Sequence, residues 1–256
     1  MLKVHRIPAF DDNYIWLIQA QGTNKAIVVD PGDATPVLNT LKSHALELIA
    51  IFITHHHADH TAGIAELTKA AALPVYGPLN ETIKGVTHPQ SGREPIVVDP
   101  DFPIFTVLNT PGHTPGHISY LAEGKLFCGD TLFAAGCGRL LGGTAEQLHT
   151  SLNLLASLPP STTIYCAHEY TLANLRFAKT VEPENKQLQQ RFEQTETMRQ
   201  KKQATVPSLM QDELATNPFL RCDVDRIKKA TEKYSGHPLP DSQAVFSSLR
   251  AWKDEF

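Results

Sequence analysis

The sequence predicts a mixed α/β or α+β fold over residues 1–168, followed by a smaller, mainly helical domain over residues 169–256. In the first part, short runs of β-branched and aromatic residues alternate with helical stretches and Pro/Gly turns, as in sheets covered by helices. In the second part the helix-favouring residues Glu, Gln, Lys, Arg and Leu are abundant. A length of 256 residues suits one large domain with a small appended one.

Eight short apolar runs, most of them close to turn-forming residues, predict strands in the first part. The run that leads into the histidine cluster is apolar almost throughout, which is typical of a strand buried on both faces. The predicted strands are Tyr14–Ala20, Ala26–Asp30, Leu48–Thr54, Ile96–Val98, Ile104–Asn109, Ser119–Ala122, Lys125–Cys128 and Thr163–Cys166.

Helices are predicted where helix-favouring residues fill the intervals between strands and dominate the C-terminal part. Those of the first part are Pro36–His44, Ala62–Ala71 and Thr144–Ser157. Those of the second part are Leu172–Lys179, Pro183–Gln203, Leu209–Ala215, Asp223–Thr231 and Ser242–Lys253.

Charge and composition argue against several classes of protein. A net charge of -4 provides no global attraction for nucleic acid. No run of about 18 apolar residues is present, so a membrane-spanning helix is not expected. The first ten residues lack the pattern of a secretory signal. The four cysteines form no CxxC pair, and Cys128 and Cys166 lie in apolar runs. We therefore expect a monomeric, cytoplasmic protein that binds neither nucleic acid nor membrane.

Four apolar runs each end in residue types that bind metals. Strand ends hold side chains rigidly and bring separate segments to one rim of a sheet, where functional groups are commonly displayed. Imidazole and carboxylate suit zinc, iron or manganese, and the lack of thiolate ligands argues against a structural zinc cage. The seven candidate ligands are His55, His57, Asp59 and His60 after the first run, then His113, Asp130 and His168.

The spacing of these ligands favours two metal ions. An extended backbone points His55 and His57 to the same side, whereas Asp59 and His60 come from the turn beyond and can face a second position. Seven ligands are too many for one tetrahedral ion and suit two ions if Asp130 bridges them.

The motif from Thr54 to His60 resembles the signature of the metallo-β-lactamase superfamily, and the three later ligands follow in its order and approximate separation. The resemblance spans residues 1–170. It implies an α+β (αββα) four-layer sandwich of two mixed β-sheets flanked by helices, with the metals at one edge. It also implies that His55, His57 and His113 hold the first ion, that Asp59, His60 and His168 hold the second, and that Asp130 is shared.

Further motifs resemble the glyoxalase II (hydroxyacylglutathione hydrolase) family along the whole chain. These are Asp12–Tyr14, Thr110–His117, Gly129–Phe133, Gly136–Arg139, Ala167–Tyr170 and the pair Arg250 and Lys253. The resemblance implies a glutathione thioester substrate bound by Arg139, Tyr170, Arg250 and Lys253. Leu141 and Gly142 depart from the family, since many relatives have an aromatic residue and Glu there.

The chemistry that this resemblance implies is hydrolysis of S-(2-hydroxyacyl)glutathione, with S-D-lactoylglutathione as the first candidate, in the second step of methylglyoxal detoxification. Two divalent ions, zinc first and iron or manganese as alternatives, lower the pKa of a shared water, and the hydroxide attacks the thioester carbonyl. Asp59 and Asp130 are then the catalytic carboxylates that hold the ions. A thiolate with a pKa near about 8.5 leaves without a strong general acid.

Simpler interpretations remain for some residues. His56 points away from the side of its neighbours and is expected to be structural. His117 is expected to pack beside the ligands and not to bind metal. Asp30, in the strand-end turn Val28–Gly32, is assigned to structure.

Other functions on the same fold stay open at this point. A persulfide dioxygenase would need one iron ion and redox chemistry, and a lactonase or β-lactamase would lack the glutathione contacts. A nuclease would need a broad basic groove. A non-enzymatic metal-binding protein would close its coordination sphere.

Overall fold

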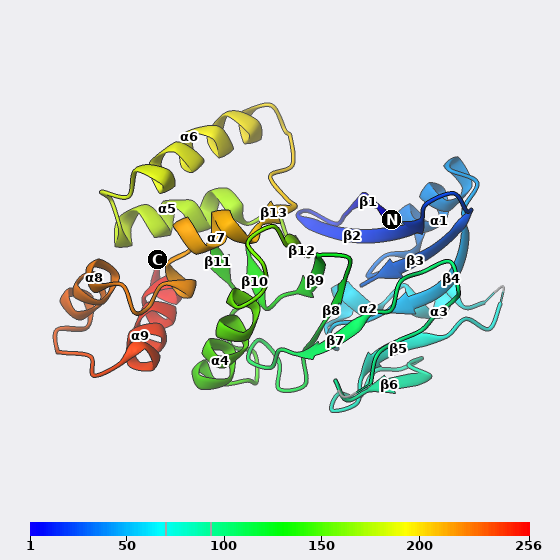
Figure 1. Ribbon diagram of the computed structural model, residues 1–256, viewed down its shortest axis with the longest axis horizontal. Coiled ribbons are helices and arrows are strands. Elements are labelled where there is room, and N and C mark those ends of the chain that lie inside the picture. The colour runs from blue at the N-terminus through cyan, green and yellow to red at the C-terminus, as the bar shows by residue number, and fades with distance from the viewer. Residues whose placement is uncertain (70, 93) are drawn as a thin grey trace. The chain divides into compact units, whose positions relative to one another are not determined.

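The computed structural model describes residues 1–69, 71–92 and 94–256, and the chain packs into two compact units (Figure 1). Unit 1 comprises Met1–Asn109 and Gly116–Gly129, and unit 2 comprises Thr110–Pro115 and Asp130–Phe256. These ranges differ from a division at residue 168, and the domain boundary expected from the sequence stays a prediction.

The larger sheet of unit 1 has six strands in the order β1-β2-β3-β4-β5-β6. The first three strands pair antiparallel and the last four pair parallel, so the sheet is mixed. Apolar side chains of the sheet pack against helix α1 (Ala34–Ser43), including its Val37 and Leu41, in one core. The strands are β1 (Leu2–Ala9), β2 (Asn13–Ala20), β3 (Lys25–Val29), β4 (Glu47–Phe52), β5 (Val75–Pro78) and β6 (His88–Gln90).

An antiparallel meander packs against this sheet within unit 1. Its strands are β7 (Thr106–Asn109), β8 (Ile118–Ala122) and β9 (Lys125–Gly129). The Tyr120 ring of β8 stacks on Phe52 of β4 at 4.5 Å between centroids, and its hydroxyl donates to the Ile53 carbonyl at 2.7 Å. The end of β4, where the histidine motif begins, is thereby held between two layers of strands.

The helix expected over Ala62–Ala71 is wrong in its extent. Among the described residues of this range only α3 (Ile64–Leu67) is helical, a second short helix, α2 (Ala58–Thr61), precedes it, and position 70 lies outside the described residues. The helical hydrogen bonding is interrupted at Gly63, because its N–H donates to the Pro31 carbonyl at 2.9 Å. An added Cβ at Gly63 would lie 2.3 Å from that carbonyl oxygen, so the close approach requires glycine.

Unit 2 is mainly helical. Thr144 and Gln147 form a capping box at the start of α4, and the Asn185 side chain caps α6 by accepting from two backbone N–H groups. Its elements are β10 (Leu132–Phe133), β11 (Gly136–Cys137), α4 (Ala145–Ala156), β12 (Thr163–Cys166), α5 (Thr171–Val181), α6 (Lys186–Gln200), β13 (Ser208–Leu209), α7 (Met210–Thr216), a 3-10 turn (Pro218–Leu220), α8 (Asp225–Ser235) and α9 (Ser242–Glu255).

The other predicted elements agree with the structure apart from small shifts at their ends, with two exceptions. The strand Ile96–Val98 is wrong: Ile96 forms an isolated bridge with Phe105, and Val97 is 65% exposed. The helix predicted over Pro183–Gln203 covers only Lys186–Gln200, because Asn185 caps it. Strands β1, β5, β6, β10, β11 and β13 were not predicted.

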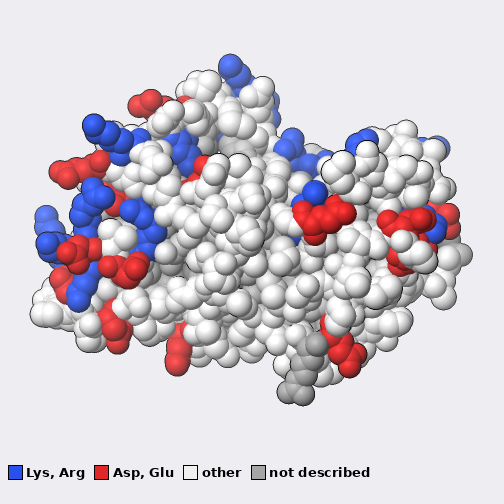
Figure 2. Space-filling model, viewed as in Figure 1, with Lys and Arg blue, Asp and Glu red and all other residues white. Residues whose placement is uncertain are grey.

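Charges of both signs are mixed on the face shown in Figure 2, where Lys and Arg side chains lie among Asp and Glu side chains. Among the described residues, no helix combines the length and the apolar character needed to cross a membrane.

The hairpin of β10 and β11 is held by side chains from the helices of unit 2. Glu213 of α7, which is fully buried, accepts from the Ala135 N–H at 2.7 Å. Asn217 donates to the carbonyls of Phe133 and Gly136 at 3.2 and 2.9 Å, and Asn174 of α5 donates to Ala134 at 3.0 Å. The turn that follows Asp130 therefore takes its shape from the helices.

We predict that Glu213→Ala lowers the free energy of unfolding by about 3–5 kcal/mol, since it leaves the largely buried Arg191 guanidinium, its ion-pair partner, without a counter-charge. Urea denaturation followed by circular dichroism measures the change. Glu193→Ala, at an exposed position of α6, is the control and is expected to stay within about 0.5 kcal/mol of the parent protein. A loss below about 1 kcal/mol for Glu213→Ala would contradict the structural role given to this ion pair.

Candidate metal centre

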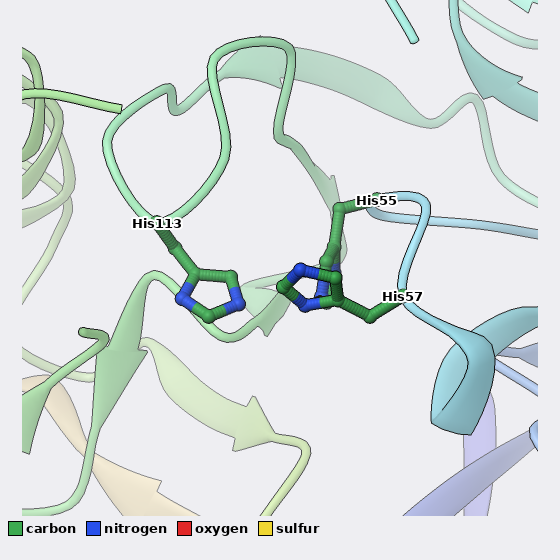
Figure 3. A group of neighbouring side chains, drawn as sticks. All are labelled: His55, His57 and His113. Atoms are coloured by element: carbon green, nitrogen blue, oxygen red, sulfur yellow. The ribbon is translucent and has the colours of Figure 1, made fainter. Parts of the chain in front are cut away.

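His55 and His57 lie in the loop after β4, which ends at Phe52, and point their rings to the same side (Figure 3). His55 is fully buried, and its Nδ1 lies 3.0 Å from the Thr54 hydroxyl. Its Nε2 lies 3.0 Å from Nδ1 of His57. Two nitrogens bound to one tetrahedral zinc at about 2.0–2.1 Å are roughly 3.3 Å apart, so this pair has nearly the spacing that one shared ion requires.

Asp59 and His60 lie in α2, one turn beyond. His60 Nε2 is 3.4 Å from Asp59 Oδ2, and Asn13 donates to the same carboxylate oxygen at 3.0 Å. The backbone of Asp59 packs directly on Gly32, where an added Cβ would lie 1.8 Å from the Asp59 carbonyl oxygen. The turn that carries Asp59 can therefore sit in this place only because residue 32 has no side chain.

Asp30, directly after β3, lies beside His60. The carboxylate of Asp30 is buried and accepts from both the N–H and the hydroxyl of Thr54 at 2.8 Å. Its Oδ2 lies 3.0 Å from Nδ1 of His60, and the opposite ring nitrogen of His60 lies 3.4 Å from Asp59. Metal-binding histidines commonly have a carboxylate partner of this kind on the second ring nitrogen. The sequence assigned Asp30 to structure, and the contact with His60 adds a role that the sequence did not indicate.

In unit 2, Asp130 lies between two histidines. Its Oδ2 is 3.5 Å from His113 Nε2, and its Oδ1 is 3.4 Å from His168 Nε2. Each carboxylate oxygen of Asp130 thus lies near a different imidazole. The position is set by packing, because an added Cβ at Gly138 would lie 2.0 Å from the Asp130 carbonyl oxygen.

The seven predicted ligands form three groups of ligand atoms, and within each group all atoms lie within 4.8 Å of one another (Figure 3 shows the first). All the donors are imidazole nitrogens or carboxylate oxygens, so the donor set fits divalent ions such as zinc, iron or manganese. The groups are His55, His57 and His113; His55, His60 and Asp130; and Asp59, His60 and His168.

Tyr170 packs face to face on His168, with 4.7 Å between ring centroids and 2° between the planes. Phe133 contacts both rings edge-on, at 5.2 Å from Tyr170 and 5.8 Å from His168. These contacts restrict the plane of the His168 ring. About a third of Tyr170 remains exposed.

Arg139, Arg250 and Lys253 form a cationic cluster around Asp254 in unit 2. Arg250 is only 3% exposed; its Nη1 donates to the carbonyls of Cys137 and Gly138 at 3.2 and 3.4 Å, and its Nη2 donates to Asp254 at 3.0 Å. Arg139 is 75% exposed, with its Nε 3.9 Å from Asp254. Arg139 is therefore open to solvent, whereas Arg250 also supports the backbone just before Arg139.

Lys253 is partly buried against aromatic rings. Its Nζ lies 5.1 Å from the centre of the Phe177 ring and 5.5 Å from that of Phe256. Burial, followed by repulsion from Arg250, lowers the pKa of Lys253 from 10.5 to about 8. This side chain therefore loses its charge at a lower pH than an exposed lysine does.

Two histidines that the sequence set aside have contacts of their own. His56 is exposed and lies 2.8 Å from the buried carboxylate of Glu81, which also accepts from the Gly116 N–H. His117 is buried and stacks on His55 at 4.8 Å. Glu81 was missed, because the segment around it carries no periodic pattern or motif.

Models of two known families match the chain. The metallo-beta-lactamase superfamily matches residues 9–168, and the hydroxyacylglutathione hydrolase C-terminus matches residues 169–256. The hydroxyacylglutathione hydrolase of Alkalilimnicola ehrlichii is 53% identical over 255 residues, which cover 100% of each chain.

Solved structures of similar fold have lower sequence identity to this chain. ETHE1 from Myxococcus xanthus is similar in fold, with a TM-score of 0.67 and 24% identity over 99% of this chain and 98% of that one. A di-iron-bound form of TTHA1623 has a TM-score of 0.53 and 29% identity over 63% of this chain and 90% of that one.

We predict that Asp30→Ala destabilises the fold by about 1–3 kcal/mol, because the buried N–H and hydroxyl of Thr54 lose their acceptor. Thermal and urea unfolding of the metal-free protein measure this. Asp33→Ala, at the exposed cap of α1, is the comparison and is expected to cost about 1 kcal/mol, the ordinary value of a helix cap. If Asp30→Ala costs no more than a few tenths of a kcal/mol, the hydrogen bonds assigned to Asp30 do not stabilise the unit.

Proposed function

The chain belongs to the hydroxyacylglutathione hydrolase family within the metallo-β-lactamase superfamily, and we propose that it hydrolyses S-(2-hydroxyacyl)glutathione thioesters. The substrate that we propose first is S-D-lactoylglutathione. The products are D-lactate and glutathione, as in the second step of methylglyoxal detoxification. The observation that carries the proposal is the set of seven His and Asp ligands in three close groups, in a chain whose relatives are similar over their full length.

We propose that these ligands hold two divalent ions. His55, His57 and His113 would bind one, Asp59, His60 and His168 the other, and Asp130 would bridge them. The position of Asp130, with one oxygen near His113 and the other near His168, supports this division, as does the di-iron-bound form of TTHA1623. Two such ions, zinc first among the candidates, supply an activated water at neutral pH and polarise the thioester carbonyl. The chain fixes the ligand geometry through Asp30, Gly32 and Gly138.

Substrate recognition is proposed for the cationic cluster. Glutathione carries two carboxylates, and Arg139 and Lys253 offer charged donors to them. Arg250 would act with them and also supports the backbone beside Arg139. Tyr170 is proposed to face the substrate with its exposed edge while its ring stays packed on His168.

The remaining expectations from the sequence stay predictions. They are zinc as the native metal, a monomeric state, a cytoplasmic location and the lack of nucleic-acid or membrane partners.

The test is hydrolysis of S-D-lactoylglutathione by the purified protein, with the metal content per chain determined on the same sample. We expect thioester cleavage with close to two ions per chain, and loss of cleavage after chelation that returns when metal is added back. Two ions without cleavage would move the function to another hydrolase of this fold. One iron per chain with oxygen consumption would indicate a persulfide dioxygenase instead.

The lowered pKa of Lys253 predicts how substrate affinity depends on pH. The amine is charged below about pH 8 and neutral above it, whereas Arg139 and Arg250 stay charged. KM for the thioester is therefore expected to rise between pH 7 and pH 9. Lys253→Met is expected to raise KM at pH 7 about tenfold, the value of one charged hydrogen bond, and to flatten this rise.

Initial rates corrected for spontaneous thioester hydrolysis measure both effects. Lys229→Met, on the exposed side of α8, is the control and is expected to retain the pH dependence of the parent enzyme. A Lys253→Met variant with the parent KM at pH 7 would remove Lys253 from the binding site.

A further inference from the structure

Asn13, in the Asp12–Tyr14 motif, has a side-chain hydrogen bond to the proposed metal ligand Asp59. It is 8% exposed at the first position of β2, and its Nδ2 donates to Asp59 Oδ2 at 3.0 Å. The backbone of Asn13 pairs with Ala9 across the hairpin of β1 and β2, so the end of a paired strand holds the side-chain amide of Asn13 in place. The contact lies wholly within unit 1.

Asp59 is far more exposed to solvent than the ligand beside it. Its side chain is 41% exposed, whereas that of His60 beside it is 1% exposed. An exposed aspartate on a helix of four residues can populate several rotamers, and the rotamers that point away from the ion compete with binding. An amide donor fixed to one carboxylate oxygen selects one of these rotamers before the ion arrives.

We propose that Asn13 is a positioning residue for the second metal ion: it holds Asp59 in its ligating rotamer and thereby sets the affinity for that ion. The inference rests on the proposed dinuclear site. His60, the neighbouring ligand, has a different carboxylate beside it, Oδ2 of Asp30 at 3.0 Å from Nδ1. Removal of the Asn13 amide therefore weakens the Asp59 ion and leaves the ion held by His55 and His57 in place.

The test is a metal titration of Asn13→Leu, which keeps the approximate size of the side chain and removes the donor. Metal-free protein is titrated with zinc against a chromophoric chelator, and bound zinc per chain is measured after dialysis at fixed chelator concentration. We expect one site with the parent affinity and one site weakened about 10–100-fold, as is usual when a residue that orients a ligand is lost. Asp11→Leu, in the same turn and exposed, is the matched control and is expected to bind two ions as tightly as the parent.

The unmutated protein separates this inference from the proposed function. If the parent chain binds fewer than two ions, the dinuclear proposal fails whatever the variant does. If the parent binds two ions and Asn13→Leu binds both as tightly, or loses both equally while its melting temperature is unchanged, the role of Asn13 is overturned. Should Asn13→Leu fail to fold, Asn13→Ser, whose hydroxyl is too short to reach Asp59, is expected to show the same selective loss. Two tight sites in Asn13→Ser would overturn the inference.

Discussion

The segment between Asp130 and Arg139 depends on hydrogen bonds from helices that follow it in the chain. Its two strands have only two residues each, and Ala135 in the turn has a left-handed φ of 57°. Such a segment cannot hold its shape alone. Its buried carbonyl and N–H groups are bonded to side chains of Glu213, Asn217 and Arg250, and a buried polar group left unpaired is costly. The proposed metal ligand Asp130 lies at one end of this segment, and the proposed substrate contact Arg139 lies at the other.

Helices and strands could be predicted where the local sequence has the pattern of apolar residues that their burial requires. Leu48–Thr54 is continuous in apolar residues because β4 is covered on both faces, and helix α4 carries its own cap at Thr144. Strand β1 was missed because the exposed residues Lys3, Arg6 and Pro8 interrupt its apolar residues, as is tolerated in a strand at the edge of a sheet. Strands as short as β11 are defined by their partners and not by their own residues.

The ligand residues of the candidate site were visible in the sequence because metal chemistry restricts their types and because each follows an apolar run. The residues that orient them were not. Asp30 precedes Pro and Gly, so it reads as a turn residue, and only the fold brings its carboxylate to His60. Glu81 likewise meets His56 across 25 positions of sequence. A contact between distant segments has no local signature.

The two family matches meet between residues 168 and 169, but unit 2 runs across this point. The carbonyls of Cys137 and Gly138 belong to the first match, and the guanidinium that binds them, Arg250, belongs to the second. Hydrogen bonds within unit 2 therefore cross the point at which the two family matches meet. Exchange of the C-terminal region between relatives would have to preserve the fit between these helices and the turn from Phe133 to Gly138.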